Sequence, residues 1–211
     1  MNLLGRWLIL LSMINNLNAQ DAERYLALGD SYTIGESVTE AERWPNQLAA
    51  KLKIGKPEII ATTGWRTDQL QAAIADAKLK PDYDLVSLLI GVNNQYQGKP
   101  VAVYEKQFEE LVQTAIQLAK GKHQHVVVVS IPDYGYTPFG KEKQEKISKE
   151  LNVYNEIGKR IALRYGVRWF DITPVSRNGL TDSSLVASDG LHPSGKMYAQ
   201  WVEIILKELK F

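Results

Sequence analysis

Cysteine is absent from the 211 residues of this sequence, and charge of one predominant sign is absent as well. Without cysteine the chain has no disulfide framework, no thiolate metal site and no cysteine nucleophile. Its 25 Lys and Arg residues balance 24 Asp and Glu residues, which gives a formal net charge of +1. This balance offers no electrostatic reason to expect nucleic acid or an anionic membrane as a partner.

The N-terminal residues follow the order of a secretory signal peptide. One basic residue, Arg6, precedes a short apolar segment at Trp7–Ile14, and a polar stretch ending in Ala19 and Gln20 follows. A membrane span needs about 20 apolar residues, so we expect export rather than stable membrane insertion. We predict that residues 1–19 are removed and that the protein is periplasmic or secreted. A buried N-terminal strand or helix is the alternative, and the absence of cysteine excludes a lipid anchor on an N-terminal cysteine.

Residues 22–211 are predicted to form one domain, because no linker, repeat or low-complexity segment divides them.

Five short apolar runs predict strands. Two of these, Leu85–Ile90 and Val126–Val129, are nearly continuous, which is typical of strands covered on both faces. The predicted strands are Tyr25–Leu28, Glu58–Ala61, Leu85–Ile90, His125–Ile131 and Val167–Phe170.

Apolar residues at helical spacing lie between these runs. The five stripes begin at Trp44, Leu70, Phe108, Ile147 and Met197. Alternation of strand and helix predicts a three-layer α/β/α domain with a five-stranded parallel sheet. In such a sheet the loops after the strands share one edge, where ligands bind. Those loops are predicted at residues 29–40, 62–67, 91–100, 132–140 and 171–193.

Ser31 is the candidate nucleophile. The apolar run Tyr25–Leu28 breaks at Gly29 and Asp30, and Ser31 follows at once. A buried strand that ends in a small-residue turn places the next side chain at the edge of the sheet. The alternative is that Ser31 caps the following helix, since Gly-Asp-Ser also suits a turn or a cap.

A serine nucleophile needs an imidazole to accept its proton and a carboxylate to orient that imidazole. His192 lies in a predicted edge loop, three residues after Asp189, and Gly190 between them lets the backbone turn. His123 and His125 precede the fourth predicted strand at the opposite edge. We interpret these two as surface residues, because no third ligand accompanies them in the sequence.

The oxyanion of an acyl-transfer reaction needs hydrogen-bond donors. Gly64 follows the second predicted strand and offers an unobstructed backbone N–H. Asn93 follows the third predicted strand and offers a side-chain amide. Glycine and asparagine are also common turn residues, but both positions fall on the same predicted edge as Ser31.

These motifs resemble those of the SGNH subgroup of the GDSL esterase/lipase superfamily, including its bacterial lysophospholipase- and thioesterase-like members. The resemblance extends from about Arg24 to the C-terminus. Gly29-Asp30-Ser31-Tyr32-Thr33 resembles the first block of the family, and Gly64 matches the glycine of the second. Gly91-Val92-Asn93-Asn94 resembles the third block, G-x-N-D, and Asp189-Gly190-Leu191-His192-Pro193 resembles the fifth, D-x-x-H-P.

The resemblance implies a flavodoxin-like sheet with strand order 2-1-3-4-5 and no metal or organic cofactor. It also implies a Ser31-His192-Asp189 triad and an oxyanion hole made by Ser31, Gly64 and Asn93. One departure is Asn94, which stands where the family has an acidic residue. An amide still hydrogen-bonds to a turn, but it carries no charge.

The expected activity is that of a serine esterase that acts on a small-molecule ester: a short-chain acyl ester, a lysophospholipid or a thioester. A carbohydrate O-deacetylase with the same triad is the alternative. A catalytically inactive ligand-binding domain and a phosphate-binding flavodoxin-like protein are less compatible with the motifs, since no G-x-G-x-x-G occurs. Four aromatic residues in the edge loops are candidates to contact substrate: Trp65, Tyr96, Tyr136 and Phe139.

Overall fold

The structure is a computed structural model that describes residues 23–209. Five parallel strands form one sheet in the order β2-β1-β3-β4-β5, which confirms the predicted sheet. The strands are β1 (Tyr25–Gly29), β2 (Glu58–Ala61), β3 (Leu85–Leu89), β4 (Val126–Val129) and β5 (Arg168–Phe170). The predicted signal peptide at residues 1–19 and the start of the domain at residue 22 lie outside the described residues.

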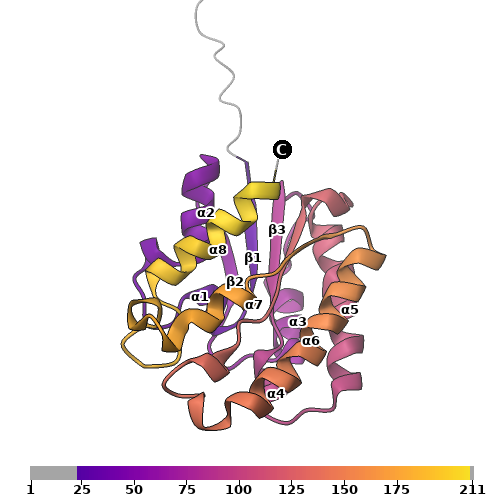
Figure 1. Cartoon of the computed structure of the whole chain (residues 1–211). Coiled ribbons are helices and arrows are strands. Elements are labelled where there is room, and N and C mark those ends of the chain that lie inside the picture. The colour runs from indigo at the N-terminus through magenta and orange to yellow at the C-terminus, as the bar shows by residue number, and fades with distance from the viewer. Residues whose placement is uncertain (1–22, 210–211) are drawn as a thin grey trace, which may run out of the picture.

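Helices cover both faces of this sheet. On one side α2 (Trp44–Leu52) packs against α8 (Gly195–Glu208), and on the other α5 (Val101–Leu118) packs against α3 (Thr67–Ala77) and α6 (Gln144–Arg164) (Figure 1). Because both faces are covered, every residue of β1, β3 and β4 is buried. This explains why those segments are nearly continuous apolar runs in the sequence. Within residues 23–209, no helix is long and apolar enough to cross a membrane.

The apolar stripes of the sequence form the buried faces of these helices. Trp44, Leu48, Leu70 and Trp201 are completely buried, and residues spaced three or four apart on a helix share a face. Burial of such side chains away from water is the main favourable contribution to folding.

Three short helices at the carboxyl end of the sheet were not predicted: α1 (Ser31–Ile34), α4 (Val92–Tyr96) and α7 (Thr173–Ser176). Each has only four or five residues, which is too few for an apolar period to be recognised. The predicted fourth strand was too long, because His123–His125 forms a 3-10 turn before β4 and Val129 ends the strand.

Gly121 follows the end of α5 but is not its cap. The cap is Ala119, and the Gly121 N–H, at φ +74°, bonds to the Ile116 carbonyl at 2.9 Å. Glycine therefore closes the turn two residues beyond the cap, where a positive φ is required.

The strand order creates a crevice at the carboxyl edge of the sheet. From β1 the chain crosses to β2 on one side and then returns to β3 on the other. The loops after β1 and β3 therefore diverge, and ligands in open α/β sheets bind at such a switch point. Ser31 follows β1, and Asn93 follows β3.

Candidate active site

Ser31 is the first residue of α1, directly after the strand-to-helix turn. Asp30, not Ser31, is the N-cap, because the Asp30 carboxylate accepts a hydrogen bond from the Tyr32 N–H at 3.1 Å. A Cβ added at Gly29 would lie 2.1 Å from the Thr33 hydroxyl oxygen, so only glycine fits this tight turn. The Ser31 side chain is therefore not used as a cap and lines a cavity instead.

The Asp189–His192 turn brings its carboxylate and imidazole together. His192 Nδ1 lies 2.6 Å from Asp189 Oδ2, and Asp189 Oδ1 accepts the Leu191 and His192 N–H groups, each at 2.9 Å. Gly190 has a φ of +73°, a conformation that glycine adopts without strain. Because Nδ1 faces the carboxylate, the remaining ring nitrogen, Nε2, is the one that can accept a proton from another group.

The hydrogen bonds at Asp189 keep this carboxylate ionised. Partial burial on its own would raise the pKa of Asp189. Hydrogen bonds from Ser37, from the His192 ring and from two backbone N–H groups outweigh burial and hold the pKa well below its usual range. The Ser37 hydroxyl donates to Asp189 Oδ2 at 2.6 Å, although the two residues are 152 positions apart in the sequence. Ser37 was not identified from the sequence.

One cavity of about 290 Å³ is lined by Ser31, His192, Gly64 and Asn93 together. These are four of the five residues predicted for the catalytic group, and they come from four different loops at the carboxyl edge. The fifth, Asp189, contacts the imidazole directly. Within residues 23–209 no hydrogen bond joins the Ser31 hydroxyl to His192; catalytic hydrogen bonds often tighten only when substrate binds.

The loops of Gly64 and Asn93 hold each other in place. Gly64 has a φ of +85° in a turn closed by the Trp65 N–H and the Thr62 carbonyl at 3.2 Å. The Asn93 side-chain amide donates to the Trp65 carbonyl at 2.9 Å. An amide nitrogen carries two hydrogens, so this bond orients the group and leaves its second N–H for another acceptor.

Asn94, the departure from the family pattern, is buried and uses both ends of its amide. Its oxygen accepts the Thr67 N–H at 3.0 Å, and its nitrogen donates to the Thr67 hydroxyl at 2.7 Å. That hydroxyl in turn donates to Gln107 at 2.5 Å. A neutral amide is thus sufficient to fix the start of α3 beside the Gly64 loop.

Asp30, the residue before Ser31, is completely buried. Burial raises its pKa from 3.8 to about 7, and hydrogen bonds from the Tyr32, Asp30 and Gly91 backbones oppose this rise. When the folded pKa exceeds the unfolded one, the unfolded chain releases its proton first as the pH rises. The free energy of unfolding should therefore fall between about pH 4 and pH 7, by at most about 4 kcal/mol from this group.

We expect Asp30→Asn to remove that contribution to the pH dependence. Urea unfolding at intervals from pH 4 to pH 8, for wild type and variant, measures the difference between the two curves. The wild type should lose stability relative to the variant as the pH rises. Parallel curves would contradict a buried, partly protonated Asp30.

Two of the four aromatic residues predicted to bind substrate lie beside Ser31. Tyr96 and Phe139 line the 290 Å³ cavity and are 59% and 52% exposed. Trp65 instead packs half-buried against the core, and Tyr136 lies under the Arg177 guanidinium at 5.7 Å. Neither belongs to the described lining of the cavity, and their role in substrate binding stays a prediction.

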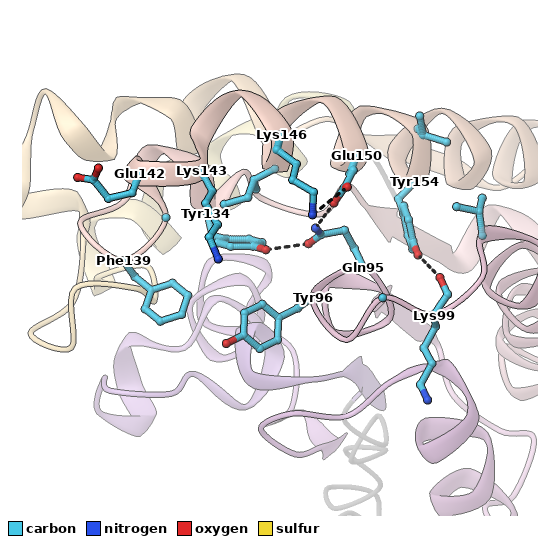
Figure 2. Close-up of a pocket in the computed structure, with 15 residues that line it drawn as sticks. Gln95, Tyr96, Lys99, Tyr134, Phe139, Glu142, Lys143, Lys146, Glu150 and Tyr154 are labelled. Carbon is cyan, nitrogen blue, oxygen red and sulfur yellow. Dashed lines mark hydrogen bonds and ion pairs between the residues drawn. The ribbon is translucent and has the colours of Figure 1, made fainter.

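A second cavity, of about 470 Å³, adjoins the first and shares Tyr96, Tyr134 and Phe139 with it. Figure 2 shows its polar network, in which the Tyr134 hydroxyl donates to Gln95 at 2.9 Å and Gln95 donates to Glu150 at 2.6 Å. Tyr96 and Phe139 stand at one side of this network, with ring centroids 6.2 Å apart. The cavity thus combines exposed aromatic faces with hydrogen-bonding groups.

Comparisons with known protein families and solved structures give one family and one fold. The GDSL-like lipase/acylhydrolase family model matches residues 27–200. A comparison with curated protein sequences gives no match.

Solved structures share the fold at low sequence identity. A lipolytic G-D-S-L protein from Veillonella parvula is 19% identical, with a TM-score of 0.68, covering 89% of this chain and 98% of its own. An acetylxylan esterase from Geobacillus stearothermophilus is 19% identical, with a TM-score of 0.63, covering 90% and 94%. A lipase/acylhydrolase from Enterococcus faecalis is 17% identical, with a TM-score of 0.65, covering 89% and 95%.

Proposed function

The chain belongs to the GDSL-like lipase/acylhydrolase family, and we propose that it hydrolyses carboxylic esters through a covalent acyl-enzyme on Ser31. The observation that carries this proposal is the single cavity lined by Ser31, His192, Gly64 and Asn93. The 2.6 Å contact between Asp189 and His192 supports Asp189 as the third member of the proposed triad. The chemistry requires no metal or organic cofactor.

In the proposed reaction His192 Nε2 takes the proton of Ser31 as its hydroxyl oxygen attacks the ester carbonyl. The carbonyl oxygen becomes an oxyanion, which accepts hydrogen bonds from the Ser31 N–H, the Gly64 N–H and the Asn93 amide. His192 then protonates the leaving alcohol, and the acyl group remains on Ser31. Water, activated by the same imidazole, attacks this acyl-enzyme and releases the carboxylic acid.

A short acyl ester is the substrate that we propose first, with lysophospholipids and thioesters in the same class. The cavity at Ser31 is small, about 290 Å³, and opens beside exposed Tyr96 and Phe139 rings. A panel of p-nitrophenyl esters from acetate to dodecanoate, with a lysophospholipid and an acyl thioester, tests this proposal. The highest kcat/KM should fall on the short acyl esters, and absence of turnover on every member would contradict it.

Deacetylation of glycans is the second candidate. It is favoured by the exposed aromatic pair beside a cavity with a polar network, because sugars stack on aromatic rings while their hydroxyls bind polar groups. A solved structure of similar fold is an acetylxylan esterase. Release of acetate from acetylated xylo-oligosaccharides much faster than from p-nitrophenyl acetate would select this candidate.

Phe139→Ala should weaken the binding of long substrates more than the binding of a small ester. Phe139 lines both cavities, so its loss should raise KM by about 3- to 10-fold for substrates long enough to enter the 470 Å³ cavity as well. The KM for p-nitrophenyl acetate should change less than twofold. Leu163→Ala removes a similarly exposed apolar side chain on α6, outside the lining of either cavity, and is the control. Equal KM changes in both variants would contradict a role for Phe139.

The exported location also stays a proposal. Fractionation of cells that express the full chain should find a product shortened at the N-terminus outside the cytoplasm.

A further inference from the structure

Ser37 is joined to the acidic member of the proposed triad. Its hydroxyl donates to Asp189 Oδ2 at 2.6 Å, and this is the same oxygen that His192 Nδ1 contacts at 2.6 Å. The other oxygen of Asp189 accepts two backbone N–H groups from its own turn. Among the described residues, Ser37 is therefore the partner of Asp189 that comes from a distant part of the chain.

The loop that holds Ser37 also holds the nucleophile. Gly35 and Glu36 each donate a backbone N–H to the Ser31 carbonyl at 3.0 Å, and Val38 donates to Gly35 at 3.3 Å. Two consecutive bonds thus tie the backbone of residues 35–38 to Ser31 itself. A hydroxyl on this loop that reaches Asp189 fixes the nucleophile loop relative to the Asp189–His192 turn.

The backbone at Ser37 is strained. Its φ is +65°, in the left-handed region that favours glycine. Lys53 and Lys78 share this conformation as C-caps of helices, and Lys120 follows the end of α5. Ser37 lies two residues beyond the α1 cap, Gly35. Glycine would fit this exposed position without strain. The serine hydroxyl has a defined partner, Asp189, which indicates that the side chain has a role.

We propose that Ser37 is a positioning residue that holds the Asp189 carboxylate in the plane required by His192. This inference rests on the proposed triad. The carboxylate shares Oδ2 between two donors, and without Ser37 this oxygen is held by the His192 ring alone, while Oδ1 keeps its two backbone N–H donors. The imidazole would then be held less firmly in its orientation toward Ser31, which lowers kcat rather than substrate affinity.

The test compares Ser37→Gly with Lys78→Gly. Both variants place glycine at a positive φ and relieve backbone strain, but only the first removes a hydroxyl from Asp189. Ser37→Gly should keep or raise the melting temperature while kcat for p-nitrophenyl acetate falls about tenfold and KM changes less than twofold. Lys78→Gly should keep wild-type kinetics.

A second variant keeps the test decisive. Ser37→Asn retains a side-chain donor and tolerates a positive φ, so it should recover part of the lost kcat. Wild-type kcat in folded Ser37→Gly would overturn the positioning role. This outcome is distinguishable from failure of the proposed function, because only the latter leaves Ser31→Ala active.

Discussion

Ser31→Ala should reduce kcat/KM for p-nitrophenyl acetate by at least about 10⁴-fold, because no other group can form the acyl-enzyme. The variant should fold normally. The Ser31 side chain lines the cavity and makes no hydrogen bond within residues 23–209, so removing its hydroxyl leaves no buried partner unpaired. Activity is measured by release of p-nitrophenolate, and folding by circular dichroism and the melting temperature.

Ser183→Ala is the matched control for this experiment. Ser183 is exposed in a 3-10 turn and does not line the cavity, so its loss should leave turnover unchanged. Undiminished hydrolysis by a folded Ser31→Ala protein would contradict the assignment of the nucleophile. A loss of activity accompanied by unfolding would instead show that Ser31 stabilises the first turn.

Asn93→Ala is expected to have the next largest effect, a fall of about 10²- to 10³-fold in kcat. The Asn93 amide is already held by its hydrogen bond to the Trp65 carbonyl. It therefore meets developing negative charge without reorganisation, and this stabilisation is realised mainly in the transition state. KM for p-nitrophenyl acetate should change little, since the ground-state carbonyl gains less from the same donor.

Loss of loop order is the competing explanation for a weak Asn93→Ala enzyme. Gln97→Ala tests this, because Gln97 donates to the Gly64 carbonyl at 3.3 Å and accepts from Arg66 at 2.7 Å. It does not line the cavity, so its removal loosens the same loops without deleting an oxyanion donor. A fall of less than about fivefold is expected. Equal losses in both variants would contradict a direct role for Asn93.

The sheet was predictable from sequence because its strands are covered on both faces. Leu85–Leu89 and Val126–Val129 are wholly buried, and continuous apolar runs are the signal that such strands leave in a sequence. The long helices were recognisable for a related reason, since each buries one face. Segments as short as Ser31–Ile34 and Val92–Tyr96 contain too few residues to show a period, so they were missed.

The candidate site was only partly predictable. Ser31, Gly64, Asn93 and His192 share an edge because parallel strands place their carboxyl ends together. The sequence could not show that Tyr96 and Phe139 line the cavity while Trp65 and Tyr136 do not. In loops the direction of a side chain is set by tertiary packing. The positive φ of Ser37, and its contact with a residue 152 positions away, leave no local signal in the sequence.

In the proposed mechanism Ser31 is an activated nucleophile whose proton is accepted by His192. Mass spectrometry after brief exposure to a fluorophosphonate tests it most directly, because this probe reacts covalently with activated serines. We predict one adduct per chain, located at Ser31, and a labelling rate at least about 100-fold lower in His192→Ala. An adduct on a different residue, or no adduct on the folded wild-type protein, would contradict the account.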